Sequence, residues 1–158
     1  MKKKTLRRIA LAFGILLVLG MSLYNWYVYR HTEVVFLYAK DGDSAVFRKG
    51  QEEIEVRFLS IDCPEYEEEL GKKAKAFTED VLKQAKKIRL VPEERSSEKD
   101  RYGRYLYWVY VDGELLQEKI LEEGLAKIEY VYGDYDLLGV LEKAERHARE
   151  NRKGIWTE

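Results

Sequence analysis

The chain has 158 residues, with 28 lysines and arginines, 29 acidic residues and a formal net charge of −1 at pH 7. All of the acids follow residue 32, whereas six basic residues lie within the first 30, so residues 31–158 carry a net charge of −7. This balance excludes a protein that coats nucleic acid non-specifically, because the affinity of such proteins comes from neutralising phosphates with positive charge. The single cysteine, Cys63, excludes an intramolecular disulfide.

The N-terminal residues predict a membrane segment. Residues 1–8 are rich in basic residues, and residues 9–29 are mostly apolar, with Asn25 as the one strongly polar residue. Basic residues before an apolar stretch of about 20 residues favour an uncleaved anchor with its N-terminus inside. A cleaved signal peptide is the alternative, for which Gly20-Met21-Ser22 is a poor cleavage site. We expect a single-pass protein of the bacterial cell membrane with its domain outside, or a secreted protein after signal cleavage.

The remaining residues, 31–158, are enough for one domain. Alternating apolar residues and turn signals predict five strands, at residues 33–38, 44–48, 52–59, 88–91 and 105–111. Apolar residues at helical spacing predict three helices, over about 74–85, 115–121 and 137–148. A helix inserted after the third of five strands is typical of a mainly β fold with packed helices (α+β), a five-stranded oligonucleotide-binding (OB) barrel.

The segment that follows the third strand carries the most distinctive chemistry. Arg57 alternates with the apolar residues of strand 52–59, so it faces away from them. Asp62 and Glu65 follow within eight residues, on either side of Pro64. A cation and two acids at the end of one strand suit the binding of a hard metal ion together with a phosphate.

Three further motifs indicate a functional site more strongly when they are considered together with this segment. Asp41-Gly42-Asp43-Ser44 is a hairpin turn signal, but Asp43 and Asp62 together can supply two carboxylates from neighbouring strand ends. The stretch 100–104 is either a solvated turn or the source of a second guanidinium for a phosphate. Tyr130 and Tyr132 share a face if that stretch is extended, which suits base stacking.

Five motifs in this order resemble the staphylococcal nuclease (thermonuclease) family over residues 33–157. They are Asp-Gly-Asp-Ser (41–44), Arg-x5-Cys-Pro-Glu with its Asp62 (57–65), Asp-Arg-Tyr-Gly-Arg (100–104), Tyr-Val-Tyr (130–132) and Gly-Ile-Trp (154–156). The resemblance implies an OB-fold, Ca²⁺-dependent phosphodiesterase that acts on DNA and RNA and leaves 3′-phosphate ends. We expect it to be a monomer.

The resemblance also implies roles for individual residues. Asp43 and Asp62 are implied calcium ligands, with Cys63 contributing its backbone carbonyl. The implied catalytic residues are Arg57, Arg104 and Glu65, the last of which orients or deprotonates the attacking water. The implied substrate-binding residues are Arg101, Tyr102, Tyr130 and Tyr132.

Two departures from the family pattern concern substrate binding. The loop after Glu65 is shorter, and Glu67 to Glu69 replace a lysine-bearing segment that contacts a nucleotide phosphate. The domain is also acidic rather than basic. The alternative from another class is a non-catalytic surface OB module that binds nucleic acid or protein.

Overall fold

The computed structural model describes residues 13–23 and 32–157, which belong to two separate units, Met1–His31 and Thr32–Glu158. Residues 13–23 are helical. No helix within the described residues is both long and apolar enough to cross a membrane. Of the predicted anchor, residues 9–12 and 24–29 lie outside the described residues, as do the basic residues 1–8, so the anchor stays a prediction.

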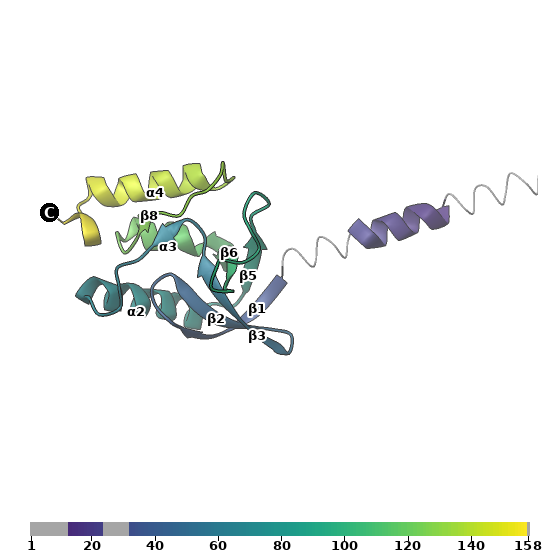
Figure 1. The fold of residues 1–158 in the computed structure, drawn as a ribbon, viewed down its shortest axis with the longest axis horizontal. Helices are drawn as coiled ribbons and strands as arrows, with labels where there is room; N and C mark the ends of the chain where they lie inside the picture. Colours follow the sequence, from purple (N-terminus) through teal and green to yellow (C-terminus); the bar gives the residue numbers. More distant parts are fainter. Residues whose placement is uncertain (1–12, 24–31, 158) are drawn as a thin grey trace, which may run out of the picture. The chain divides into compact units, whose positions relative to one another are not determined.

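Five strands of the second unit close into a barrel (Figure 1). They are β1 (Thr32–Ala39), β2 (Ser44–Lys49), β3 (Glu52–Phe58), β5 (Ile88–Pro92) and β6 (Tyr105–Val111). Neighbours in the order β3-β2-β1-β5-β6 are antiparallel, and a parallel pairing that sets Arg57 opposite Leu106 closes the ring. The predicted five-stranded α+β barrel is confirmed, and it is consistent with an OB fold.

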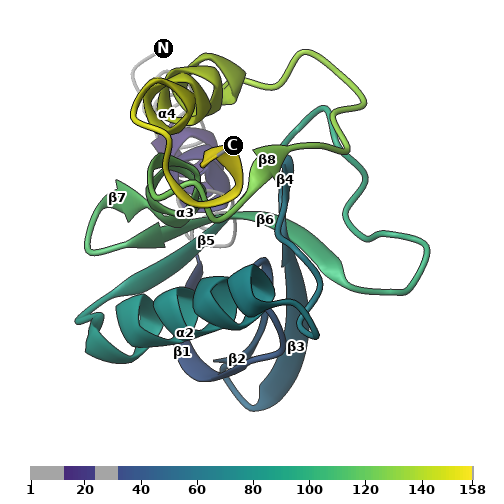
Figure 2. The same cartoon turned by 90° about the vertical axis from the view of Figure 1, so that its left-hand side faces the viewer.

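Helices cover two sides of this barrel (Figure 2). Helix α2 (Glu69–Gln84) packs against β1, whereas α3 (Leu116–Glu122) lies between β6 and α4 (Leu138–Glu150). A short 3-10 helix, η1 (Gly154–Trp156), follows α4. Barrel and helices share one core, whose largest fully buried side chains include Phe47, Phe58, Leu90, Leu116, Ile120, Leu121 and Leu141.

Helix α2 begins five residues earlier than its apolar pattern predicts. The polar residues before Ala74 suggest a loop, but Glu69 pairs with Lys73 one turn later at 2.7 Å and lies in the first helical turn. An acidic side chain is favourable there because it complements the positive end of the helix dipole. The acidic segment 67–69 is therefore partly the start of a helix rather than wholly a loop.

Three two-residue strands escape the sequence patterns because so short a run has no period. Strand β7 (Glu114–Leu115) extends the sheet beside β6. Strand β4 (Ile61–Asp62) pairs antiparallel with β8 (Lys127–Ile128), setting Asp62 opposite Lys127. After β8 the chain does not continue as an extended strand, since Tyr130 has a φ of 57°. The two tyrosines therefore do not share a face in the predicted way.

Candidate active site

The turn after β1 is fixed by its own side chains and by α2. Asp41 Oδ1 accepts hydrogen bonds from the Asp43 amide at 3.0 Å and from the Ser44 hydroxyl at 2.8 Å. Thr78 of α2 donates to the Gly42 carbonyl at 2.6 Å. Asp43 Oδ2 in turn accepts from the Cys63 amide at 2.7 Å. Asp43 thus joins the turn after β1 to the segment after β4.

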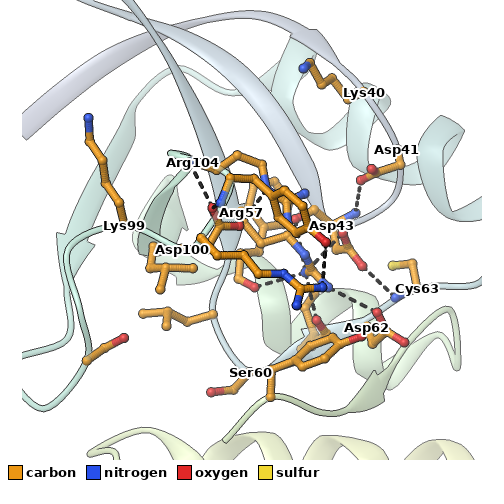
Figure 3. Close-up of a pocket in the computed structure, with 18 of the residues that line it drawn as sticks. Lys40, Asp41, Asp43, Arg57, Ser60, Asp62, Cys63, Lys99, Asp100 and Arg104 are labelled. Atoms are coloured by element: carbon orange, nitrogen blue, oxygen red, sulfur yellow. Dashed lines mark hydrogen bonds and ion pairs between the residues drawn. The ribbon is translucent and has the colours of Figure 1, made fainter. Parts of the chain in front are cut away.

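Arg57 links the two acids that the motifs single out (Figure 3). Its Nη1 lies 3.0 Å from Asp43 Oδ1, and its Nη2 lies 3.1 Å from Asp62 Oδ1. Nη1 also donates to the carbonyls of Phe58 at 3.2 Å and Ile61 at 2.8 Å. Arg57 faces away from the apolar side of β3, yet the residue is only 9% exposed, and its guanidinium is hydrogen-bonded to carbonyls on both sides of the turn after β3. The guanidinium therefore has one well-defined position.

The charges around Arg57 leave an excess of carboxylate. Burial raises the pKa of Asp43 from its ordinary 3.8 to about 7; Arg57 opposes this rise and Asp41 adds to it. Lys127 offers a second cation, but its Nζ lies 3.8 Å from Asp62 Oδ2 and closer, at 3.1 Å, to Glu129. A cation bound beside Asp43 would favour the ionised carboxylate.

Arg104 is held by its own loop rather than by the barrel floor. Its Nε donates to Asp100 Oδ2 at 2.8 Å, and Asp100 Oδ1 accepts from the amides of Tyr102 and Arg104 at 2.9 and 3.0 Å. Partial burial alone would raise the pKa of Asp100, but these hydrogen bonds hold it below its ordinary value. The carboxylate therefore stays ionised and keeps Arg104 in position.

A cleft of about 770 Å³ brings these groups together with exposed aromatic rings. The loops at 65–67, 96–104 and 130–135 all contribute to its lining and lie at one end of the barrel (Figure 2). Tyr102, Tyr130 and Tyr132 are 68%, 52% and 81% exposed. The guanidinium carbon of Arg57 lies 5.7 Å from the centre of the Tyr130 ring. Arg57 at the floor, Arg104 in a bordering loop and the aromatic rings at the edges suit a polyanion with flat, stacking groups.

Comparisons with known proteins identify the family of the chain. The family model described as "Staphylococcal nuclease homologue" matches residues 55–158. The thermonuclease of Staphylococcus hyicus is 32% identical over 144 residues, which cover 87% of this chain and 80% of that protein. The chain belongs to the staphylococcal nuclease family.

Two relatives from Bacillus subtilis (strain 168) extend the comparison. The SPbeta prophage-derived endonuclease YokF is 34% identical over 125 residues, covering 75% of this chain and 42% of that protein. Endonuclease YncB is 33% identical over 126 residues, covering 75% of this chain and 59% of that protein. The chain thus spans about half the length of these two endonucleases, whereas it spans most of the length of the thermonuclease.

The residues predicted from the nuclease-family motifs fall into two groups. Asp43, Arg57 and Asp62 form one connected cluster at the floor of the cleft. The others border the same cleft without direct contact to both acids; they are Glu65, Arg101, Tyr102, Arg104, Tyr130 and Tyr132. Arg101 donates to the Tyr102 hydroxyl at 2.6 Å, so these two predicted substrate-binding residues are hydrogen-bonded to each other.

Glu65 has a fixed backbone and an unengaged carboxylate. Its carbonyl accepts from the Glu68 amide at 3.0 Å, and a Cβ on Gly71 would come within 1.9 Å of the same oxygen. Gly71 therefore lets the start of α2 approach the Glu65 backbone. Among the described residues, no hydrogen bond or ion pair engages the Glu65 carboxylate, which is exposed at the cleft and accessible to water.

The donor atoms at the floor of the cleft suit a hard divalent cation. Within residues 13–23 and 32–157, no group of three or more His, Cys, Asp and Glu side chains is arranged to hold a metal ion. Ca²⁺ also accepts carbonyl and water oxygens, so Asp43 and Asp62 can contribute two carboxylates of a larger oxygen set. Burial, followed by the Asp43 charge, raises the pKa of Cys63 well above its ordinary value, so its sulfur stays a neutral thiol. The expected role of its carbonyl stays a prediction.

The sequence did not reveal Lys127 as a residue of the site, nor the role of Asp100 in it. Lys127 reaches Asp62 through the β4–β8 pairing, for which two residues on each side leave no pattern. Asp100 was visible in its motif, but its part in holding Arg104 depends on a turn in which Gly103 has a φ of 83°. The sequence signal for that turn is the Tyr-Gly pair, because glycine adopts positive φ at little cost.

Proposed function

We propose that the chain is a Ca²⁺-dependent phosphodiesterase that hydrolyses DNA, RNA or both at the cell surface or outside the cell, leaving 3′-phosphate ends. The observation that carries the proposal is the Arg57 guanidinium, which bridges the Asp43 and Asp62 carboxylates in a cleft that Arg104 and exposed tyrosines also border. The relatives, a thermonuclease and two endonucleases by name, support the same activity.

Each part of the site has a task in this reaction. Asp43 and Asp62 would hold the cation, which when bound supplies positive charge beside the phosphate. Arg57 and Arg104 would bind the equatorial phosphate oxygens, where negative charge grows in the transition state. Glu65 would orient or deprotonate the attacking water, since a carboxylate can act as a base at neutral pH without a histidine.

The deciding experiment measures hydrolysis of labelled single-stranded DNA and RNA by the full chain. Activity should disappear when a chelator is added and return with Ca²⁺. Glu65→Gln should bind the same substrates but cleave them far more slowly, because the amide cannot take a proton from water. Hydrolysis that survives chelation would refute the calcium role. Binding without hydrolysis by the unaltered chain would instead identify a non-catalytic OB module.

Location and assembly are further parts of the proposal. We propose that residues 9–29 anchor the chain as a single membrane span with the domain outside, and that the domain is a monomer. The observation that supports the anchor is the basic segment 1–8 before an apolar stretch of spanning length. Membrane fractionation of cells that express the full chain tests the anchor, and a shortened soluble form in the medium would show signal cleavage instead.

A further inference from the structure

Tyr66 is an exposed aromatic residue at the cleft that belongs to none of the five motifs. It follows Glu65 directly, lines the cleft and is 48% exposed. The Nζ of Lys75, on α2, lies 4.8 Å from the centre of its ring. This cation–π contact holds the ring against the start of α2 while leaving about half of the residue accessible. The folded chain therefore supports a fourth aromatic surface at the cleft.

The β4–β8 pairing separates Tyr66 from the motif tyrosines. In this antiparallel ladder Asp62 lies opposite Lys127 and Ile61 lies opposite Ile128. The chain therefore runs from Asp62 toward Tyr66 in one direction and from Ile128 toward Tyr130 in the opposite direction. The Glu129 amide, which donates to the Ser60 carbonyl at 3.2 Å, continues the second direction. The backbone therefore reaches Tyr66 on one side of Asp62 and Tyr130 on the opposite side.

Contacts on each side agree with this separation. Cys63, the first residue after Asp62, lies so near α2 that a Cβ on Gly42 would approach both the Cys63 Sγ and the Ala74 Cβ to 2.6 Å. Tyr66 continues to the same helix, where it contacts Lys75. Tyr130, in contrast, lies over Arg57 at the floor. A strand whose phosphate sits at Arg57 would extend toward aromatic rings on both sides.

The charges beside Tyr66 select a base rather than a phosphate. Glu65, Glu67 and Glu68 are all exposed on this short segment, and carboxylates repel a phosphate group. A neutral base has no such penalty, and every base has a π face that can stack on an aromatic ring. Lys75, beside the same ring, supplies one cation that offsets the local acidic charge.

We propose that Tyr66, supported by Lys75, is a base-stacking subsite for single-stranded nucleic acid, on the side of the scissile phosphate opposite Tyr130 and Tyr132. The inference rests on the proposed nuclease function and adds a second binding surface to it. A substrate that occupies both sides has nucleotides before and after the cleaved bond. The subsite therefore favours cleavage within a strand over removal of a terminal nucleotide.

The test combines tyrosine variants with abasic substrates. Short single-stranded oligonucleotides, each with one abasic position, are bound to the full chain in the presence of a chelator and at low salt, and fluorescence anisotropy gives their dissociation constants. Tyr66→Ala should weaken binding of the intact oligonucleotide by about 5- to 150-fold. One abasic position should remove that difference between variant and parent. Tyr132→Ala should be coupled to a different position, across the cleaved bond.

Two variants control for effects on the fold. Tyr66→Phe keeps the ring and should bind like the parent chain. Tyr38→Ala removes a tyrosine that is 49% exposed on β1, outside the cleft lining, and should also leave binding unchanged. The inference is overturned if Tyr66→Ala has no effect or if it weakens binding of all abasic oligonucleotides equally. It is also overturned if the abasic position coupled to Tyr66→Ala is the same as the one coupled to Tyr132→Ala.

Cleavage measured separately with Ca²⁺ distinguishes the inference from the proposed function. If the parent chain binds with the expected coupling but does not cleave, the subsite stands and the phosphodiesterase proposal fails. If it cleaves while Tyr66→Ala behaves like the parent in both assays, the phosphodiesterase proposal stands and the subsite fails. A parent chain that binds none of the oligonucleotides contradicts the subsite directly.

Discussion

The floor of the cleft and the loops around it hold their side chains in different ways. At the floor, the Arg57 side chain is 10% exposed and is fixed by two carboxylates and by backbone carbonyls from its own and neighbouring segments. In the loops, the Arg104 side chain is 25% exposed and is fixed by Asp100 four residues earlier, while Tyr132 is 81% exposed. The barrel thus sets the geometry of the charged centre, whereas the loops can change without disturbing it.

Replacing Arg57 should produce the largest effect, on both activity and stability. Arg57→Met would leave the buried Asp43 carboxylate without its cation and the Ile61 carbonyl without its donor. Removing one partner of a buried ion pair typically costs about 3–5 kcal/mol of unfolding free energy. Losing the group proposed to bind transition-state charge should also slow hydrolysis by about 10²–10³-fold or more. Urea denaturation and initial rates measure the two effects.

A matched control uses an arginine on the outside of the same barrel. Arg48, on β2, is exposed, and Arg48→Met should change neither the unfolding free energy nor the rate appreciably. If Arg57→Met were as stable as Arg48→Met, the floor would not be part of the structural framework, and the contrast with the loops would fail.

Arg104→Met should separate activity from stability. We expect a loss of rate of about 10²–10³-fold, because Arg104 also borders the proposed phosphate position. The unfolding free energy should change by about 1 kcal/mol or less, since a partly exposed ion pair contributes little. The same two measurements apply. A stability loss as large as that of Arg57→Met would show that the loop is as rigid a part of the fold as the floor.

The proposed calcium binding at the floor should depend on pH through Asp43. Its pKa is raised to about 7, so the carboxylate is mostly protonated below that pH and must lose a proton to bind a cation. Apparent calcium affinity should therefore fall by about tenfold for each pH unit below 7. Calorimetric titration at several pH values checks this, and affinity that stays constant between about pH 5 and about pH 8 would contradict it.

The same raised pKa predicts how stability changes without calcium. A group whose pKa is higher in the folded state than its ordinary 3.8 contributes stability below that value and loses it as the pH rises through about 7. Calcium should therefore raise the melting temperature more at about pH 8 than at about pH 6, because it stabilises the ionised carboxylate. Asp43→Asn, which cannot ionise, should remove this pH dependence and the effect of calcium together.

Sequence patterns predicted the barrel and the grouping of three charged residues at its floor because both have local signals. Strand β6, Tyr105–Val111, lies where its run of β-prone residues predicts, and Asp43, Arg57 and Asp62 lie together as their motifs indicate. The β4–β8 pairing had no such signal, since two residues cannot show a period. As a result neither Lys127 beside Asp62 nor the opposite directions of Tyr66 and Tyr130 could be recognised without the folded chain.

The acidic segment before α2 offers the smallest and most specific test of the loops. Glu67 is exposed and borders the cleft. Glu67→Gln removes one negative charge near an anionic substrate, so the KM for single-stranded DNA should fall by about two- to fivefold at low salt. The kcat should stay nearly constant, because Glu67 contributes none of the groups assigned to the reaction. Glu122→Gln, on the exposed side of α3, removes the same charge away from the cleft and is the matched control.

Salt dependence decides whether this effect is electrostatic. The Debye length shrinks from about 10 Å at 0.1 M salt to about 3 Å at 1 M, so the benefit of Glu67→Gln should disappear as salt is added. A packing change in the loop would persist at high salt and would also appear in the unfolding free energy. If Glu122→Gln lowered KM equally, the overall charge of the domain would govern binding rather than the acidic segment. Loss of the Glu67→Gln effect in salt, with stability unchanged, would mean that this loop adjusts substrate affinity while the barrel floor keeps its geometry.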